Sequence, residues 1–284
     1  MTSPKASSSA PTQQAAAPTR RKTLLDMRQM HESGEKIAML TCYDAGFAAL
    51  LEGAGVDSLL IGDSLGMVVQ GRDLPIPVTL ADMIYHTECV ARRSRSAFII
   101  SDMPFGTSQV SPGDTFGHAA RLLQAGAQMV KIEGGLEMAP TVEFLARRGI
   151  PVCAHVGLTP QSANVFGGFR IQGRSPEDAA RILEASKALE SAGAHMLLME
   201  GVPRPLADAV CAAVRIPTIG IGASPVCSGQ VLVVYDALDI PPGRKARFVR
   251  NFMDGATSIE GAVRAYVASV KDGSFPAAEH CYPA

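Results

Sequence analysis

The stretch Met129-Val130-Lys131-Ile132-Glu133 is a short apolar run that ends in an acid, and it sets the interpretation of the whole chain. Apolar runs of this length are typical of buried parallel strands. An acid at the carboxyl end of such a strand lies at the edge where α/β proteins place their chemistry. Three more runs have this form: Leu59-Leu60-Ile61-Gly62-Asp63, Phe98-Ile99-Ile100-Ser101-Asp102 and Met196-Leu197-Leu198-Met199-Glu200. Four converging acids would raise each other's pKa unless a cation neutralises them.

Strand-like and helix-like segments alternate after residue 23. The segments predicted as strands are 37–43, 58–62, 98–101, 129–132, 152–155, 196–199, 218–221 and 231–234, and those predicted as helices are 45–53, 80–93, 114–124, 138–148, 176–192, 205–214 and 259–271. An Ala-Gly pair followed by Ala or Val recurs at Gly55, Gly126 and Gly193, where glycine would end a helix in a left-handed turn. This pattern predicts an α/β fold, a (β/α)₈ TIM barrel rather than an open doubly wound sheet.

The seventh and eighth units depart from the pattern. Nine residues separate positions 221 and 231, and a parallel crossover with a full helix needs about a dozen. Either the seventh helix is degenerate, or residues 230–235 are themselves helical and the barrel closes irregularly.

The first 22 residues differ in composition from the rest. They are rich in Ala, Ser, Pro, Thr and Gln, which predicts a disordered N-terminal tail. The tail lacks the apolar segment of a secretory signal and has less Arg than a transit peptide usually has. Residues 23–284 are predicted to form a single barrel domain with a C-terminal helix and tail.

The bulk composition excludes several classes of protein. With 47% hydrophobic residues, 19% charged residues and a net charge of −1, the chain is suited neither to nucleic-acid binding nor to a membrane surface. No apolar run is long enough for a transmembrane helix. Six scattered cysteines without a Cys-x-x-Cys pair argue against a zinc site or a disulfide framework. We therefore expect a cytoplasmic protein.

Asp63, Asp102 and Glu133 end three consecutive predicted strands. Neighbouring strands lie about 4.8 Å apart, so these acids could share one small ligand. Three oxygen donors without His or Cys nearby suit a hard cation, most simply Mg²⁺. The alternative is that each acid caps a helix or pairs with an Arg.

Lys131 and Glu200 complete the predicted chemistry. Lys131 shares a strand face with Glu133 and would bind a carboxylate or a developing enolate oxygen, with a Schiff base as the alternative. Glu200 ends the sixth strand, apart from the metal acids, and the apolar run before it would desolvate it as a general base requires. The alternative is an ion pair with Arg204.

Three further features are less specific. His155 on the fifth strand is either a satisfied core residue or a member of the site. Ser64 could hold a substrate carboxylate through its hydroxyl or its backbone N–H. The long glycine-rich loop 157–174 is either a lid over the barrel mouth or a plain solvent loop.

Longer motifs resemble a known family, the ketopantoate hydroxymethyltransferase (3-methyl-2-oxobutanoate hydroxymethyltransferase) family. They are Ile61-Gly62-Asp63-Ser64-Leu65-Gly66-Met67, Asp102-Met103-Pro104-Phe105, Val130-Lys131-Ile132-Glu133-Gly134-Gly135, His155-Val156-Gly157-Leu158-Thr159-Pro160-Gln161-Ser162 and Ile219-Gly220-Ile221-Gly222-Ala223. The resemblance runs in order from about residue 23 to the region of residue 280. It implies a barrel of the phosphoenolpyruvate/isocitrate-lyase-like type and an assembly as a homodecamer of two five-membered rings.

The resemblance also implies an activity. A hydroxymethyl group would pass from 5,10-methylenetetrahydrofolate to 3-methyl-2-oxobutanoate through a Mg²⁺-stabilised enolate. The product would be 2-dehydropantoate, in the first step toward pantothenate and coenzyme A. The folate-binding residues stay unassigned.

Individual roles follow from the matching positions. Asp63, Asp102 and Glu133 would surround Mg²⁺, Ser64 and Lys131 would bind the keto acid together with Asp63 and Asp102, and Glu200 would accept the proton. Two positions depart from the family: Gly201 and Ser224 stand where other members often carry Cys and Gly.

Two other functions remain open. An isocitrate-lyase-like carbon–carbon lyase acting on a small 2-oxo acid would use the same metal acids, but would also carry a catalytic Cys on a mouth loop, for which Cys227 is the nearest candidate. A non-catalytic oligomeric barrel is the other alternative, and the intact acids with Lys131 argue against it.

Overall fold

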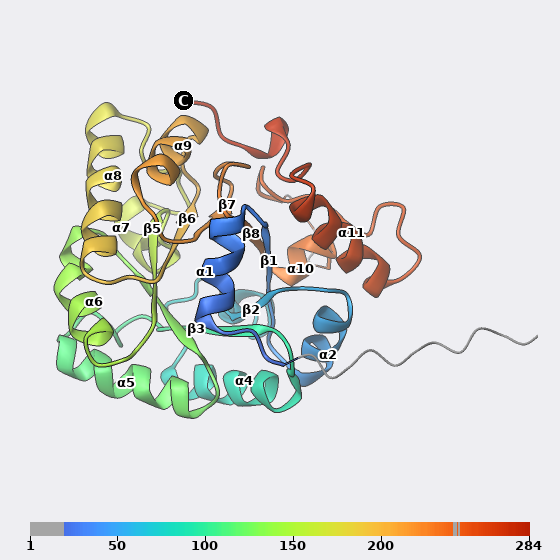
Figure 1. Ribbon diagram of the computed structural model, residues 1–284, viewed down its shortest axis with the longest axis horizontal. Helices are drawn as coiled ribbons and strands as arrows, with labels where there is room; N and C mark the ends of the chain where they lie inside the picture. Colours follow the sequence, from blue (N-terminus) through green and yellow to red (C-terminus); the bar gives the residue numbers. More distant parts are fainter. Residues whose placement is uncertain (1–19, 241–242, 244) are drawn as a thin grey trace, which may run out of the picture.

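The computed structural model describes residues 20–240, 243 and 245–284, and these form a closed barrel of parallel strands (Figure 1). The strands are β1 (Ile37–Thr41), β2 (Ser58–Ile61), β3 (Phe98–Asp102), β4 (Met129–Glu133), β5 (Val152–Gly157), β6 (Met196–Glu200), β7 (Thr218–Ile221) and β8 (Gly229–Leu232). Each strand pairs with the next in chain order, and β8 pairs with β1 to close the sheet. The predicted (β/α)₈ barrel is therefore confirmed.

Helices surround the barrel, most of them in a ring outside the strands (Figure 1). They are α1 (Leu24–Ser33), α2 (Ala45–Gly53), α3 (Leu65–Val68), α4 (Leu80–Arg93), α5 (Pro112–Gln124), α6 (Ala139–Ala146), α7 (Ala163–Phe166), α8 (Pro176–Ser191), α9 (Arg204–Ala213), α10 (Val234–Ala237) and α11 (Ile259–Lys271), with 3₁₀ turns η1 (Leu136–Met138), η2 (Pro160–Ser162) and η3 (Ala278–His280). Hydroxyl or carboxylate caps begin several helices, as Asp44 does for α2. Gly55, Gly126 and Gly193 adopt φ of 95°, 114° and 99°, which confirms the predicted turns.

The seventh unit lacks its helix, which confirms the first of the two alternatives that the sequence left open. The second alternative, a helix over residues 230–235 with irregular closure, is wrong, because residues 229–232 form β8, which pairs with β7 and β1. Residues 222–228, between β7 and β8, contain no helix. Strand β8 begins two residues before the predicted segment 231–234, and the short helix α10 follows it. Helix α11 supports the seam, because Tyr266 Oη lies 2.7 Å from the carbonyl oxygen of Met39 on β1 and 2.9 Å from that of Gln230 on β8.

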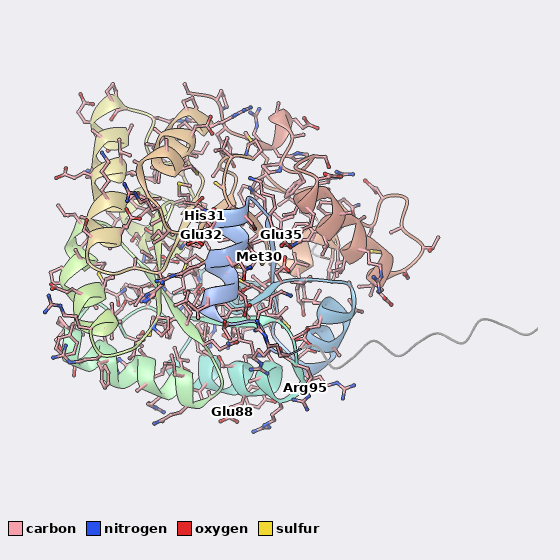
Figure 2. All side chains as sticks on the ribbon, viewed as in Figure 1. Met30, His31, Glu32, Glu35, Glu88 and Arg95 are labelled. Carbon is pink, nitrogen blue, oxygen red and sulfur yellow. The ribbon has the colours of Figure 1, made fainter. Side chains whose placement is uncertain are left out.

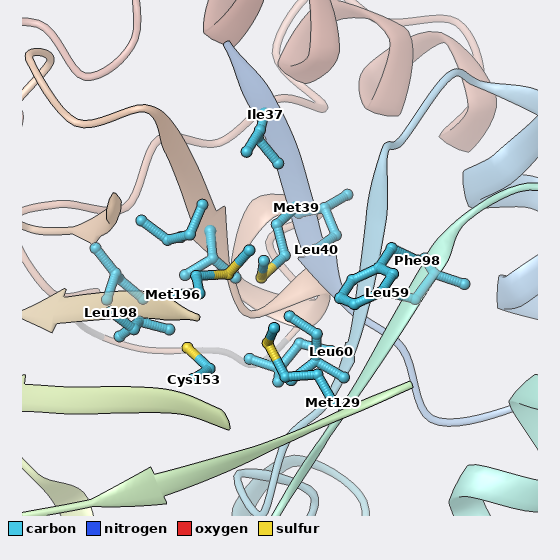
Figure 3. Close-up of a cluster of buried hydrophobic side chains, with 14 of the residues drawn as sticks. Ile37, Met39, Leu40, Leu59, Leu60, Phe98, Met129, Cys153, Met196 and Leu198 are labelled. Atoms are coloured by element: carbon cyan, nitrogen blue, oxygen red, sulfur yellow. The ribbon is translucent and has the colours of Figure 1, made fainter. Parts of the chain in front are cut away.

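Apolar side chains fill the inside of the barrel. Figure 3 shows the buried cluster, with Met39, Leu60, Met129, Met196 and Leu198 gathered between the strands. Each such side chain contributes about 1.5–3 kcal/mol when it is fully buried. Because this layer closes the interior, polar chemistry is confined to the ends of the barrel.

Helix α1 covers the amino end of the barrel, where Figure 2 labels Met30, His31, Glu32 and Glu35. His31 Nδ1 lies 2.7 Å from Ser228 Oγ just before β8, and the Lys22 backbone N–H donates to Ser96 O just before β3. Residues 1–19 lie outside the described part, so the disordered tail stays a prediction. Within the described ranges, no helix is both long and apolar enough to cross a membrane.

Candidate active site

A cavity of about 280 Å³ opens at the carboxyl end of the barrel. It brings together every residue that the sequence nominated for the site: Asp63, Ser64, Asp102, Lys131, Glu133, His155 and Glu200. Asp102, Glu133 and Glu200 are the last residues of β3, β4 and β6, and Asp63 follows β2 by two positions. Because the strands are parallel, their carboxyl ends lie at the same end of the barrel, and these carboxylates meet at one rim, as the sequence predicted.

Each of the three predicted metal acids has one oxygen held by an N–H donor. Gln161 Nε2 donates to Asp63 Oδ2 at 2.8 Å, and the Gln161 backbone N–H donates to Glu133 Oε2 at 2.9 Å. The Asp63 backbone N–H donates to Asp102 Oδ2 at 3.0 Å. The alternative interpretation, that each acid caps the helix that follows it, is not supported by these bonds. The Gln161 N–H lies in the 3₁₀ turn η2, which follows β5, and the Asp63 N–H that bonds to Asp102 follows β2.

Gly62 permits the close packing of this rim. A Cβ at position 62 would lie 2.7 Å from Ser64 Oγ and 3.7 Å from Asp102 Oδ2, so a side chain would displace the serine hydroxyl. That hydroxyl lies 2.9 Å from Tyr43 Oη, which sequence reasoning did not assign to the site. Tyr43 therefore fixes the direction of the Ser64 side chain.

Lys131 lies among the acids. Its Nζ is 3.1 Å from Asp102 Oδ1 and 3.6 Å from Glu133 Oε1. Burial lowers the pKa of Lys131, but the charges of Asp102, Glu133 and Asp63 outweigh burial and raise it well above the ordinary value. Because an ammonium group is not a nucleophile, this environment favours the ionic role of Lys131 over a Schiff base.

Negative charge at this rim exceeds the positive charge. Burial first, and then the Glu133 carboxylate, raise the pKa of Asp63 to about 6. Burial raises the pKa of Asp102 to about 7 although Lys131 opposes it, and the pKa of Glu133 is also raised by burial. Three buried carboxyl groups thus surround one ammonium group.

This donor set fits a hard divalent cation. Carboxylate oxygens are the ligands that Mg²⁺ prefers, and the excess negative charge would be offset by a cation of charge two. Asp102 Oδ1 is buried with no hydrogen-bond partner apart from its ion pair with Lys131. Among the residues that the structure describes, no three His, Cys, Asp or Glu side chains already stand as a ligand set, so the acids would adjust on binding.

His155 links the acid cluster to Glu200. Its Nδ1 lies 3.2 Å from Lys131 Nζ, which can only donate, so the ring proton belongs on Nε2. That Nε2 lies 3.4 Å from Glu200 Oε2, a long contact. Burial and the Lys131 charge lower the pKa of His155, which keeps the ring neutral.

Glu200 is the most open of the site acids. Its side chain is 17% exposed, compared with 3% for Asp102 and Glu133. The alternative pairing with Arg204 is not what the structure shows, since Arg204 Nε lies 3.7 Å from Asp208 on its own helix. Glu200 therefore faces the cavity as a separate carboxylate.

Sequence reasoning missed Gln161 as a site residue. It lies in η2, inside the loop 157–174, and is 5% exposed. Leu158, Pro160, Phe169 and Ile171 of this loop line the cavity, so the loop forms part of its wall. A neutral amide in a loop carries no charge or periodicity that would have marked it.

Three residues singled out for other reasons lie around the barrel. Gly201 lines the cavity, whereas the Ser224 hydroxyl donates to Asp208 Oδ1. Cys227, the nearest candidate for the cysteine of a lyase, lies two residues before β8, and Lys36 Nζ donates to its carbonyl oxygen. It is therefore at the amino end, opposite the acids.

The fold and rim define the class of protein first. A phosphoenolpyruvate phosphomutase from Streptomyces platensis subsp. rosaceus matches with a TM-score of 0.59 at 16% identity, covering 75% of this chain and 82% of that one. Phosphonopyruvate hydrolase in complex with oxalate and Mg²⁺ matches with a TM-score of 0.57 at 12% identity, covering 75% and 81%. A 2,3-dimethylmalate lyase described as a PEP mutase/isocitrate lyase superfamily member matches with a TM-score of 0.52 at 21% identity, covering 69% and 70%. These likenesses show that the chain has the barrel fold of these proteins.

The sequence then gives the family. A family model described as ketopantoate hydroxymethyltransferase matches residues 21–278. A relative from Nitrosospira multiformis is 62% identical over 255 residues, 90% of this chain and 97% of its own length. One from Dechloromonas aromatica is 57% identical over 270 residues, covering 95% and 99%. Both are named 3-methyl-2-oxobutanoate hydroxymethyltransferase. The chain belongs to the ketopantoate hydroxymethyltransferase family, which confirms the predicted family, function and transferase class over the lyase and the non-catalytic barrel.

Proposed function

We propose that the cavity transfers a hydroxymethyl group from 5,10-methylenetetrahydrofolate to 3-methyl-2-oxobutanoate with the help of Mg²⁺. The bond between C3 of the keto acid and its hydrogen breaks, and C3 forms a new bond to the one-carbon unit. Water supplies the hydroxyl oxygen, and tetrahydrofolate leaves. The observation that carries this proposal is the presence, in one cavity, of an acid cluster with too little positive charge to balance it and a separate open carboxylate.

Asp63, Asp102 and Glu133 would hold the Mg²⁺ ion. When bound, Mg²⁺ would polarise the keto oxygen and favour negative charge on it. The names of the relatives and the fold neighbour that holds oxalate and Mg²⁺ support this assignment.

Lys131 and Ser64 would bind the keto acid at the same rim. Asp63 and Asp102 would also contact it there. The buried ammonium of Lys131 is an attractive partner for a substrate oxygen, and a charge in a dry site acts more strongly than one in water. Tyr43 holds the Ser64 hydroxyl in place. Leu60 and Leu198 of the cavity wall would receive the branched alkyl group.

Glu200 would accept the C3 proton. Its carboxylate faces the cavity, and the neutral ring of His155 presents its Nε2 side at 3.4 Å. Among the described residues Nε2 has no hydrogen-bond partner, and a small rotation would let it donate to Oε2 of Glu200 and leave the other oxygen free to take the proton. His155 would thus orient the base without itself exchanging a proton.

Hydrogen exchange at C3 of 3-methyl-2-oxobutanoate in deuterated water tests this chemistry without folate. We expect the wild type to catalyse exchange of this hydrogen with solvent deuterium when Mg²⁺ is present, and we expect the exchange to stop when EDTA removes the metal. Glu200→Gln should retain keto-acid binding and lose about 10²–10⁴-fold in exchange rate. Glu184→Gln, an exposed change on α8, is the control. Persistent exchange in Glu200→Gln would show that another group is the base, and no exchange with any divalent cation would contradict the enolisation.

Three further parts of the proposal rest on the resemblance or on the cavity wall. They are assembly as a homodecamer, residence in the cytoplasm and closure of the loop 157–174 over bound substrate. Sedimentation velocity measures the first: a species of about ten chains is expected, and a monomer would contradict it.

A further inference from the structure

Gln161 forms hydrogen bonds at the rim of the barrel through both polar atoms of its side chain and through its backbone N–H. Its Nε2 donates to Asp63 Oδ2 at 2.8 Å and to Met103 O at 2.9 Å, and its backbone N–H donates to Glu133 Oε2 at 2.9 Å. Its Oε1 accepts from Gln109 Nε2 at 3.2 Å. One residue from the loop after β5 therefore connects the carboxyl ends of β2, β3 and β4.

The two bonds to acids select which oxygens remain for a ligand. Gln161 occupies Asp63 Oδ2 and Glu133 Oε2, whereas Glu133 Oε1 faces Lys131 Nζ at 3.6 Å. On Asp102 the same division holds: Oδ2 accepts from a backbone N–H and Oδ1 faces Lys131. The bonds of Gln161 thus restrict the rotation of two carboxylates, and on Glu133 they leave the oxygen that faces Lys131.

A glutamine suits this position for a reason of charge. It donates two hydrogen bonds without adding charge to a cluster that already has three acids. A glutamate would add a fourth carboxyl group, and because a carboxylate only accepts, the bond to Asp63 would be lost and replaced by repulsion. A lysine or arginine would neutralise the acids and compete with a divalent cation.

The position of Gln161 in the loop joins the acids to the cavity wall. Pro160 beside it and Phe169 further along the same loop both line the cavity. A shift of the loop would move the backbone N–H of Gln161 and its side chain together. Whatever orders the loop would then orient the acids, and by thermodynamic reciprocity whatever binds the acids would order the loop.

We propose that Gln161 is the positioning residue that sets Asp63 and Glu133 for the cation and couples cation binding to the order of the loop 157–174. The inference rests on the Mg²⁺ site of the proposed function. Gln161 acts through the two acids and touches neither the substrate nor the reacting atoms.

Metal titration of the purified protein tests the first half. Mn²⁺, observed by electron paramagnetic resonance, reports both affinity and ligand symmetry in the absence of substrate. We expect Gln161→Ala to weaken Mn²⁺ binding by about 10–100-fold, as loss of a residue that orients metal ligands does. Gln109→Ala is an exposed change that removes the bond to Gln161 Oε1 together with two bonds that Gln109 Oε1 accepts from the Gly106 and Ser108 backbone N–H groups, and it should weaken Mn²⁺ binding by a few-fold.

The matched control is Gln172→Ala in the same loop, whose side-chain amide donates to Arg170 O. It should bind Mn²⁺ as the wild type does. Because a structural defect alone would not respond to ion concentration, the C3 exchange of Gln161→Ala should recover at saturating Mg²⁺.

Hydrogen–deuterium exchange of the backbone tests the second half. Mg²⁺ should slow exchange across residues 157–174 in the wild type and in Gln172→Ala, and this protection should be lost in Gln161→Ala. Wild-type metal affinity in Gln161→Ala would overturn the inference while leaving the proposed function intact. A wild type that catalyses transfer yet binds no Mn²⁺ or Mg²⁺ would overturn the metal assignment and this role of Gln161 together, and a wild type that binds Mn²⁺ yet performs no transfer would contradict the function alone.

Discussion

The two ends of the barrel differ in how buried negative charge is neutralised. At the amino end, Asp57 accepts from the Ala38 backbone N–H at 2.9 Å and from Lys271 Nζ at 2.7 Å, and Lys22 Nζ lies 3.4 Å away. At the carboxyl end, Asp102 and Glu133 pair with the ammonium of Lys131, and Asp63 lies near enough for its charge to raise the pKa of Lys131 as well. Two cations around one acid stabilise a structure, whereas three acids around one cation leave charge for a ligand to neutralise.

The imbalance at the carboxyl end carries a cost in stability. Raised pKa values of Asp63 and Asp102 mean that burial destabilises their charged forms. A tenfold change in an acid dissociation constant corresponds to about 1.4 kcal/mol. Interactions at the amino end and in the apolar barrel interior must offset this cost. The two ends therefore contribute to the free energy of unfolding with opposite signs. Substitutions at each end should reveal the asymmetry.

The largest effect is expected for Lys131→Met. Loss of this ammonium leaves the three acids without their buried cation and removes a positive charge from the substrate oxygen. We expect the C3 exchange rate to fall by about 10²–10³-fold. In EDTA the free energy of unfolding, measured by urea denaturation, should fall by about 3 kcal/mol.

The matched control for Lys131→Met is Lys271→Met at the amino end. It also removes a lysine that faces a buried acid, so it should lower stability, but the exchange rate per folded molecule should not change. A similar loss of exchange in both variants would show that general stability, not the local charge, limits the reaction.

Asp57→Asn should have the next largest effect, and on stability alone. The asparagine keeps an oxygen for the Ala38 N–H but loses the charge that faces Lys22 and Lys271. We expect a loss of about 2 kcal/mol in the free energy of unfolding, since hydrogen bonds to charged groups contribute about that much. Mg²⁺ affinity should remain as in the wild type. Asp73→Asn, at an exposed acid, is the control and should leave stability unchanged.

Asp63→Asn should change stability in the opposite direction. The Asn oxygen can still accept from Gln161 Nε2, while one buried negative charge is removed. In EDTA at pH 8, above the pKa of about 6, the free energy of unfolding should rise by about 1 kcal/mol. Addition of Mg²⁺ should stabilise the wild type and have a smaller effect on this variant. A variant less stable than the wild type in EDTA would contradict the excess of charge inferred for this end.

The sequence predicted the acid rim because strand periodicity carries the necessary information. Lys131 and Glu133 are two residues apart on one strand, so their common face followed from the backbone alone. The strand β8 was placed two residues late because its register is set by its neighbours: Gly229 pairs with Ile37 on β1 and with Ile219 on β7. Local hydrophobicity around Val231 could not show this.

The contacts between loops and strands were beyond sequence reasoning. Gln161 and Asp63 are 98 positions apart, and their bond depends on how the loop 157–174 folds over the rim. The contact between His155 and Glu200 joins two neighbouring strands, but its 3.4 Å distance depends on side-chain rotation. Charge and periodicity therefore predict which residues reach the site, while neutral donors and rotamers are decided by tertiary packing.

The smallest expected effect belongs to Glu52 on α2, at the balanced end of the barrel. Its carboxylate accepts from the Ser94 hydroxyl and from the backbone N–H groups of Arg95, Ser96 and Ala97 just before β3. Partial burial raises the pKa of Glu52, but these bonds outweigh it and lower the pKa below its ordinary 4.5.

A lowered pKa makes the contribution of Glu52 depend on pH. A carboxyl group with a depressed folded-state pKa contributes stability above its unfolded pKa of about 4.5 and loses it as the pH falls through the folded value. Glu52→Gln should therefore cost about 0.5 kcal/mol at pH 7, after allowance for solvent screening, and progressively less as the pH falls below about 4.5. Urea unfolding of both proteins from pH 3 to pH 7 measures this. If the free energy of unfolding differed between the two proteins by the same amount at every pH, Glu52 would stabilise this end by packing, and its negative charge would not contribute.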